Sequence, residues 1–207
     1  MSPRPYRLGQ RQATTDQTRA RILAAARQLL AAPGGIAGFT VEAVARQADV
    51  SRMTVYYQFG SKAGLLEALF DQLATTGRLP QRTAAAFRQP DPLAALAGYV
   101  AAFAGFWAAE RLVLRRLRSL AALDPELAQG VRARDARRRK GLELLVGRLA
   151  DRYGHPPPDA LAEAVVVLHM LTSFETFDAL AGPDRSPQDV AGQVHRLAVA
   201  ALGLPQQ

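Results

Sequence analysis

Proline and glycine divide this 207-residue chain into stretches in which apolar side chains recur every three to four residues. That spacing places apolar residues on one face of an α-helix, whereas strict alternation, which is nearly absent here, is typical of a half-buried strand. The sequence therefore predicts an all-α protein. The breaks between its helices are expected at Pro33-Gly34-Gly35, Pro125, Pro156-Pro157-Pro158, Pro183 and Pro187.

Capping residues set the expected helix starts. A first helix is expected to begin near Thr15 or Asp16, whose side-chain oxygens can accept hydrogen bonds from free backbone N–H groups. Thr40, Ser51 and Ser61 hold the corresponding position before three further helices, of which the first two are short. Later helices are expected at 91–108, 110–122, 125–152, 159–181 and 187–202, after an irregular link over 80–92 in which a helical piece is possible.

Charge and composition limit the partners and the compartment. The net charge of +8 favours polyanions such as nucleic acid, although it does not decide the fold. The chain has no cysteine, which excludes disulfides, thiolate metal sites and a cysteine nucleophile, and which is consistent with a reducing compartment. Residues 1–11 lack the apolar segment of a signal peptide. We therefore expect a cytoplasmic protein with no membrane partner, and we interpret the apolar stretch 160–174 as a core or interface helix.

Residues 40–60 meet the requirements of two short helices joined by a tight turn. Ala45 is small where the helices approach each other, and Val50 and Val55 are apolar where the inner face requires it. Asp49 is at the turn position that usually favours glycine, because the backbone there is often left-handed, and aspartate tolerates that conformation better than most residues. The second helix of such a pair can lie in the major groove of DNA and present its N-terminal side chains to the bases.

The side chains of this second helix suit a DNA groove. Arg52 can donate two hydrogen bonds to guanine, and Thr54 can bind a base or a phosphate and contact a thymine methyl group. Tyr56 and Tyr57 are large, flat and polar at the tip, which suits groove walls and phosphate oxygens. Lys62 is in the first turn of the next helix, where its charge gains nothing from the helix dipole, so a phosphate partner would explain it. Instead of binding guanine, Arg52 could contact a phosphate or remain solvated.

The stretch FTVEAVARQADVSRMTVYYQFGSKAGLL, residues 39–66, resembles the DNA-binding domain of the tetracycline-repressor (TetR) family, and the resemblance covers about residues 15–75. It implies a three-helix DNA-binding head, a homodimeric all-α body, and usually a small-molecule effector that releases DNA. By position, Thr40 and Lys62 match phosphate contacts of the family. Asp49 replaces the usual turn glycine, Gln58 the frequent histidine and Ala63 the frequent glutamate. The DNA-binding residues that we predict are Thr40, Ser51, Arg52, Met53, Thr54, Tyr56, Tyr57, Gln58 and Lys62.

The predicted organisation has three parts: a flexible basic arm at 1–14, a DNA-binding helix-turn-helix domain at 15–75, and an effector-binding and dimerisation domain at 76–207. The arm would act either as a minor-groove reader or as a disordered solubilising tail. Dimerisation would double the contacts that one short recognition helix can make, by pairing two half-sites.

The body has two groups of candidate residues. Aromatic side chains at helical spacing ordinarily pack in a core, and the lining of an effector cavity is the alternative. The candidate pocket residues are Phe103, Phe106, Trp107, His169, Met170 and Phe174. The last two long helices resemble the dimerisation pair of the family, with candidate interface residues Val165, Leu168, Phe177, Val194, Leu197 and Ala201.

Other functions have less support in the sequence. The basic run 132–140 would wrap around most of a helix, so it is either a solvated segment or the mouth of a pocket for an acidic effector. His169, Ser173 and Glu175 cannot all converge on one helix face, so we expect no enzyme. His169 has no second histidine or carboxylate at metal-ligand spacing, so we expect no metal, and we expect no cofactor. We expect a repressor that a small molecule releases from double-stranded operator DNA. The alternatives are a helix-turn-helix regulator without such an effector and an interaction module that does not bind DNA.

Overall fold

The computed structural model describes residues 4–204, with side chains from Ala13 onward, and this part of the chain is helical without any strand. The all-α prediction is confirmed. The chain divides into two compact units: residues up to Gln72 together with Leu112–Val131 form the first, and Leu73–Arg111 with the residues from Arg132 onward form the second. The first unit, which we call the head, therefore includes a segment that sequence analysis had assigned to the body. The second unit is called the body below.

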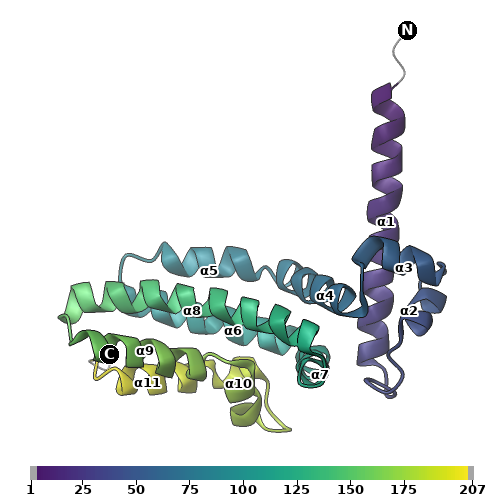
Figure 1. Ribbon diagram of the computed structural model, residues 1–207. Helices are drawn as coiled ribbons and strands as arrows, with labels where there is room; N and C mark the ends of the chain where they lie inside the picture. The colour runs from purple at the N-terminus through teal and green to yellow at the C-terminus, as the bar shows by residue number, and fades with distance from the viewer. Residues whose placement is uncertain (1–3, 205–207) are drawn as a thin grey trace. The chain divides into compact units, whose positions relative to one another are not determined.

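Four helices begin the chain: α1 (Arg4–Ala31), α2 (Val41–Gln47), α3 (Arg52–Phe59) and α4 (Lys62–Thr76). Helices α2 and α3 lie beside α1 (Figure 1), and Ile22, Val44 and Val55 are among the side chains that they bury together. Helix α1 begins eleven residues before the expected start at Thr15, so the predicted arm is helical from Arg4 onward. Proline is compatible with the first turn of a helix, so Pro5 does not prevent this extension. Residues 1–3 lie outside the described part.

The remaining part of the head comes from α7 (Arg111–Ala121) and from the beginning of α8 (Pro125–Tyr153). Arg116 of α7 donates hydrogen bonds to the carbonyl groups of Leu30 and Ala32 at the end of α1, the second over 2.7 Å. Gly35 leaves the space for this guanidinium, because a Cβ atom there would lie 2.6 Å from Cζ of Arg116. The end of α1 is thus stabilised by a cation, which suits the negative end of the helix dipole.

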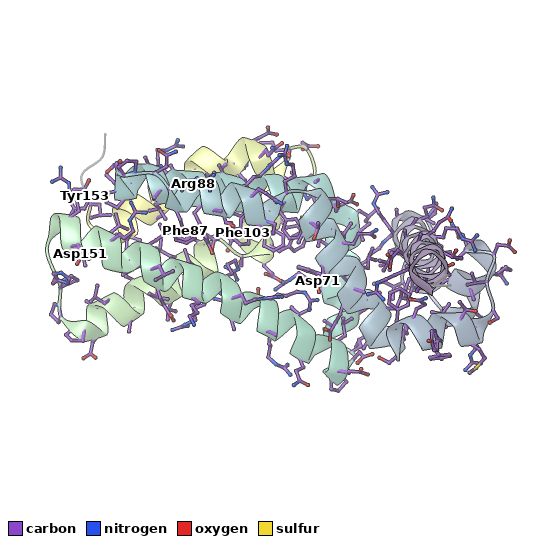
Figure 2. The ribbon with its side chains drawn as sticks, turned by 90° about the horizontal axis from the view of Figure 1, so that it is seen from above. Asp71, Phe87, Arg88, Phe103, Asp151 and Tyr153 are labelled. Carbon is purple, nitrogen blue, oxygen red and sulfur yellow. The ribbon has the colours of Figure 1, made fainter. Side chains whose placement is uncertain are left out.

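The body is built around α6 (Pro92–Ala109), which α5 (Leu79–Phe87), α10 (Phe174–Ala181) and α11 (Ala191–Ala201) contact. The part of α8 after Val131 also contacts α6, since Tyr99 donates a hydrogen bond to the Arg138 carbonyl over 2.9 Å. Figure 2 shows Phe87 and Phe103 next to each other between the helices of the body. Their rings lie 5.7 and 5.0 Å from that of Tyr99. The expected irregular link at 80–92 is mostly the helix α5.

Helix α6 corrects the expectation about apolar runs. Its 18 residues are long and apolar enough to cross a membrane, whereas sequence analysis had singled out only the apolar stretch 160–174. In the structure 67% of α6 is buried among the other body helices. Burial of this kind is typical of the central helix of a packed core.

The expected helix at 159–181 is broken into α9 (Pro158–Leu171) and α10, which are bent by 51°. Ser173 has extended backbone angles and accepts a hydrogen bond from the backbone N–H of Thr176, so it caps α10 as a new helix. The hydroxyl of Thr172 donates back to the carbonyl of Leu168 over 2.8 Å. Local bonds of this kind compete with a continuous helix, and periodicity alone did not reveal them. The expected last helix also begins as a short 3-10 turn, η1 (Pro187–Val190), before α11.

Candidate nucleic-acid interface

The turn between α2 and α3 has a left-handed residue at its centre. Asp49 has φ +51°, so the prediction of a left-handed backbone at this position is confirmed. The N–H of Val50 donates to the carbonyl of Ala45, and that of Asp49 to the carbonyl of Arg46. These two bonds form the Schellman ending of a helix, in which glycine usually takes the place that Asp49 has here. The turn that sets the direction of α3 is therefore complete without glycine.

Ser51 begins α3 as its N-cap. Its hydroxyl oxygen accepts from the backbone N–H of Thr54 over 3.0 Å, and the two hydroxyl groups lie 2.8 Å apart. Only Val55 of this helix is fully buried, against the rest of the head. Tyr57 is 87% exposed and Met53 is 73% exposed. Two large side chains that gain so little from burial in the chain are available to a partner.

Arg52 is held by neighbours on the exposed surface. Its guanidinium is 2.9 Å from the Glu42 carboxylate and lies over the Tyr56 ring, 5.3 Å from its centre. The Tyr56 hydroxyl and then the Glu42 carboxylate raise the pKa of Arg52 above its ordinary value, so its charge is constant. An exposed ion pair of this kind is weak and readily exchanged for another partner. The sequence analysis had not assigned Glu42 a part in orienting Arg52.

The end of α3 is fixed to α1 through Arg19. This side chain donates a hydrogen bond to the Gln58 carbonyl over 2.9 Å, and its guanidinium lies 4.3 Å from the centre of the Phe59 ring. Arg21 similarly donates to the carbonyl of Asp49 in the turn over 3.2 Å. Both ends of α3 are thus attached to α1, so its exposed face is presented on a rigid support.

The loop from α3 to α4 depends on two glycines. Gly60 has φ +75°, and the N–H of Ser61 donates to the Phe59 carbonyl across it, which is a tight three-residue turn. Gly64 has no room for a side chain, because a Cβ atom there would lie 2.2 Å from the Phe59 carbonyl oxygen. Lys62 follows at the start of α4, with its ammonium 5.6 Å from the centre of the Phe39 ring. Sequence analysis had not singled out Gly64 within its motif.

Thr40 completes the predicted set at the start of α2. Its side-chain oxygen accepts a hydrogen bond from the backbone N–H of Ala43 over 3.0 Å, as expected of an N-cap. All nine predicted DNA-binding residues therefore belong to the head. They lie at the starts of α2 and α4 and along α3: Thr40, Ser51, Arg52, Met53, Thr54, Tyr56, Tyr57, Gln58 and Lys62.

The candidate pocket residues of the body mostly pack against one another. Trp107 lies at the centre, with its ring 4.8 Å from Phe106, 5.7 Å from Phe103 and 5.6 Å from Phe174. These four side chains are buried, whereas Met170 is 57% exposed. Core packing, the ordinary role of aromatic side chains at this spacing, is what the structure shows for these four residues.

His169, the sixth candidate, belongs to a buried polar cluster at the end of α9. Its Nε2 atom is 2.9 Å from the guanidinium of Arg138, which also donates to the Thr172 hydroxyl and is 3.2 Å from the Asp135 carboxylate. Burial, and then the charge of Arg138, lowers the pKa of His169. Trp107 donates to the Thr172 carbonyl from the other side over 3.2 Å. The basic run 132–140 is thus not uniformly solvated, since Arg138 is only 4% exposed.

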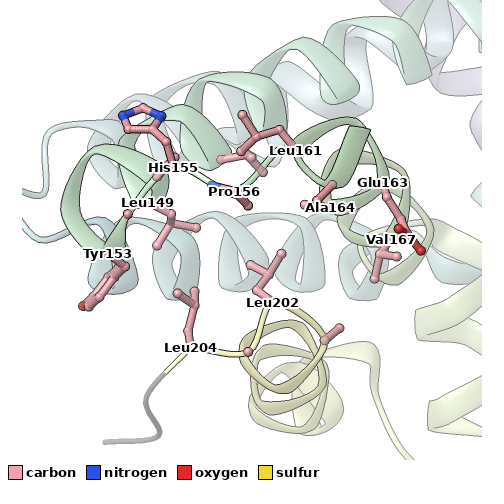
Figure 3. Close-up of a pocket in the computed structure, with 16 residues that line it drawn as sticks. Leu149, Tyr153, His155, Pro156, Leu161, Glu163, Ala164, Val167, Leu202 and Leu204 are labelled. Carbon is pink, nitrogen blue, oxygen red and sulfur yellow. The ribbon is translucent and has the colours of Figure 1, made fainter. Parts of the chain in front are cut away.

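A cleft of about 590 Å³ lies elsewhere in the body, among the end of α8, α9 and the end of α11 (Figure 3). Leu149, Leu161 and Leu202 point into it, and Tyr153 and Glu163 lie at its margin. None of the six candidate pocket residues lines it. Sequence analysis missed it because its walls come from three segments whose periodicity marks them only as packed helices.

The candidate interface residues are largely enclosed within one chain. Val165, Leu168, Phe177 and Val194 are buried in the isolated protein, so they cannot form the outer surface of a dimer. Periodicity identified the apolar faces of these helices, but those faces cover the chain's own core. Leu197 is exposed, and Ala201 is exposed and also lines the cleft.

Comparisons with known proteins agree with this architecture. Residues 22–69 match the family described as bacterial regulatory proteins, tetR family. No match was found among curated proteins. The tetR-family regulator PfmR from Thermus thermophilus has 24% identity and a TM-score of 0.64 over 90% of this chain and 100% of its own. NalD, the secondary repressor of the MexAB-OprM multidrug efflux pump in Pseudomonas aeruginosa, has 23% identity and a TM-score of 0.64 over 91% of this chain and 96% of its own. Similarity at this level of identity shows the shared fold.

Proposed function

Since residues 22–69 match the tetR family of bacterial regulatory proteins, we propose that this chain is a homodimeric, cytoplasmic repressor of that family, which a small-molecule effector releases from operator DNA. The observation that carries the DNA-binding part is the exposed face of α3. That face carries the guanidinium of Arg52, which can donate two hydrogen bonds, the hydroxyl of Thr54 and the large exposed ring of Tyr57. The helix is attached to α1 at both ends. A rigid helix with such side chains suits the major groove.

Phosphate contacts would position this helix on the duplex. The Thr40 hydroxyl uses one lone pair to cap α2 and retains its proton for a phosphate oxygen. Lys62 adds a cation at the start of α4, which is the positive end of that helix, and this arrangement favours phosphate. Such contacts are independent of sequence and set the register in which Arg52 meets the bases.

A dimer would form through side chains that are exposed in the single chain. On α9, Val166 is 51% exposed and Met170 lies one turn further along the same face. On α11, which packs against α9, Leu197 is 43% exposed. We therefore propose these three residues as the centre of the interface, in place of the buried neighbours that the sequence favoured. A subunit interface has to bury apolar area that the isolated chain leaves in water.

The effector would bind in the body, and the cleft lined by Leu149, Leu161 and Leu202 is the site that we propose. Its volume of about 590 Å³ lies within the range of small-molecule sites, about 300–1,000 Å³. Its lining combines apolar side chains with the polar groups of Tyr153, His155 and Glu163, which favours a ligand that has an apolar part and a polar group. Such a ligand can release DNA only by binding one arrangement of the dimer more tightly than the arrangement that fits two successive major grooves.

Selection from a pool of random duplexes by the purified protein, followed by sequencing, tests the proposal. A two-fold-symmetric sequence with a fixed spacing between half-sites is expected to be enriched, because a symmetric dimer reads two equivalent half-sites. Enrichment of a single half-site would contradict the dimer, and absence of any enrichment at low salt would contradict sequence-specific binding.

A further inference from the structure

The first turn of α8 places a carboxylate at the beginning of α4. Oε1 of Glu126 accepts a hydrogen bond from the Ser61 hydroxyl over 2.8 Å. Asp124 fixes this turn by accepting from the backbone N–H groups of Glu126 and Leu127, over 3.0 and 3.2 Å. Leu127 is buried in the head. The position of the Glu126 carboxylate is thus set by a helix start that is both capped and anchored.

Ser61 uses its only hydroxyl proton in this contact. Its oxygen accepts from the backbone N–H of Gly64 over 2.9 Å, and its single proton goes to Glu126. Ser61 immediately precedes Lys62, so the carboxylate lies at the positive end of α4, where the proposed DNA phosphate would bind. A carboxylate and a phosphate diester are both anions, and both are stabilised by the same helix end.

Residues 112–131 also contain Arg116, whose charged side chain contacts a different helix end in the head. Arg116 stabilises the carbonyl end of α1, and Glu126 stabilises the N–H end of α4, so each side chain complements the dipole of the helix that it contacts. Arg116 contacts Gly35 and the end of α1, which are not among the residues proposed to touch DNA. Of these two contacts only the one by Glu126 coincides with a proposed phosphate position.

We propose that Glu126 is an internal competitor of the DNA phosphate at the start of α4, so that residues 112–131 keep the head in a state of lowered DNA affinity. This inference rests on the proposed function, in which Lys62 and the start of α4 bind phosphate. DNA binding then requires the carboxylate to leave Ser61 or to remain close to a phosphate against electrostatic repulsion. A change in the body that withdrew the start of α8 would raise DNA affinity by removing this competitor.

Glu126→Gln tests the inference, because glutamine keeps the size and the acceptor oxygen but removes the charge. The control is Glu143→Gln, which makes the same change in net charge about 25 Å further along α8 at 1.5 Å per residue, beyond the Debye length of about 10 Å in 0.1 M salt. Both variants and the original protein are titrated into a fluorescent duplex of random sequence, and their thermal unfolding is recorded. We expect Glu126→Gln to bind DNA about three- to tenfold more tightly, with no gain in thermal stability, and Glu143→Gln to change the affinity by less than about twofold.

Each outcome decides a different point. Unchanged or weaker binding by Glu126→Gln, with the original protein still binding, would show that Glu126 is only a helix cap and would overturn this inference alone. An equal gain for Glu143→Gln would also overturn it, by assigning the effect to net charge. Tighter binding by Arg116→Gln would contradict competition, because loosening of the segment rather than loss of the anion would then explain the gain. Failure of every protein to bind duplex DNA at low salt would overturn the proposed function as well.

Discussion

The head and the body differ in where their candidate functional residues lie. In the head these residues are on or next to one short exposed helix, and its two large exposed side chains, Met53 and Tyr57, gain almost nothing from folding. In the body the aromatic side chains singled out by spacing, such as Trp107 and Phe106, are packed together and stabilise the fold. Spacing along a helix thus shows which residues share a face, whereas the role of that face depends on what covers it.

The largest expected effect contrasts two glycines. Gly64→Ala in the head should lower the free energy of unfolding by about 3 kcal/mol, because the new methyl group would meet the Phe59 carbonyl oxygen at 2.2 Å. Gly147→Ala in α8 of the body meets nothing within 4 Å, and it should raise stability by about 0.5–1 kcal/mol through helix propensity. Urea denaturation of both variants measures the two changes. A mild effect at Gly64 would show that the loop before α4 can relax.

Two tyrosines provide the next contrast. Tyr57→Ala should weaken binding to the selected duplex by about tenfold or more, as loss of a central aromatic side chain does, and should leave thermal stability unchanged because the ring is solvent-exposed. Tyr99→Phe should instead affect stability and leave binding unchanged, because the Tyr99 hydroxyl is buried and donates a hydrogen bond to the Arg138 carbonyl. The same burial raises the pKa of Tyr99. Removal of this hydroxyl should lower stability by about 1 kcal/mol without changing DNA affinity. An effect of Tyr57→Ala on stability but not on binding would remove this residue from the DNA surface.

Within the head, Arg52→Ala and Lys62→Ala should weaken binding in different ways. Without Arg52, the preference at one base pair in each half-site should relax by roughly tenfold. Without Lys62, binding to all sequences should weaken alike, and the slope of log affinity against log salt should fall by about 0.9 for each phosphate that the protein no longer neutralises. Titrations on duplexes with single substitutions, at several salt concentrations, separate the two. Uniform weakening for Arg52→Ala would reassign it to the backbone, and an unchanged slope would show that Lys62 binds no phosphate.

The smallest effect is a pH dependence confined to the body. The chain has three histidines, none of them before residue 155, and burial lowers the pKa of His169 and His195 below the ordinary value of 6.5. The unfolded chain therefore binds protons more readily than the folded body, so stability is full above pH 6.5 and falls as the pH drops below that value. Thermal unfolding at pH 7.5 and 5.5 should show this decrease, and His169→Gln should reduce it. An equal decrease in the variant would assign the dependence to other groups.

The sequence predicted more of the head than of the body, for physical reasons. Capping by Thr40, Ser51 and Ser61, and the left-handed backbone of Asp49, depend on neighbours within a few residues, so they could be identified before the fold was known. The contacts of Arg116 with the end of α1 could not, because they join segments more than eighty residues apart. The helix α1 was expected to be shorter, since local signals marked several acceptable starts.

The body shows where local patterns stop being informative. Apolar periodicity identified the inner faces of α9 and α11 but could not tell a face that covers the chain's own core from one that would cover a partner. Val165 and Val194 are thus buried, whereas Val166, the next residue to Val165, is exposed. The break between α9 and α10 depends on hydrogen bonds from the Thr172 and Ser173 side chains to the backbone. The sequence alone does not show whether such bonds form. The cleft at Leu161 and Leu202 needs three helix ends to be placed together.

Comparison of two duplexes shows whether the exposed face of α3 recognises a specific DNA sequence. The protein is titrated into the selected duplex and into a scrambled duplex of the same composition, at near-physiological salt. We predict binding at least about a thousandfold tighter to the selected duplex, and disappearance of most of this ratio in Arg52→Ala. Equal affinity for the two duplexes would contradict specific recognition, because the head would then bind DNA through its charge alone.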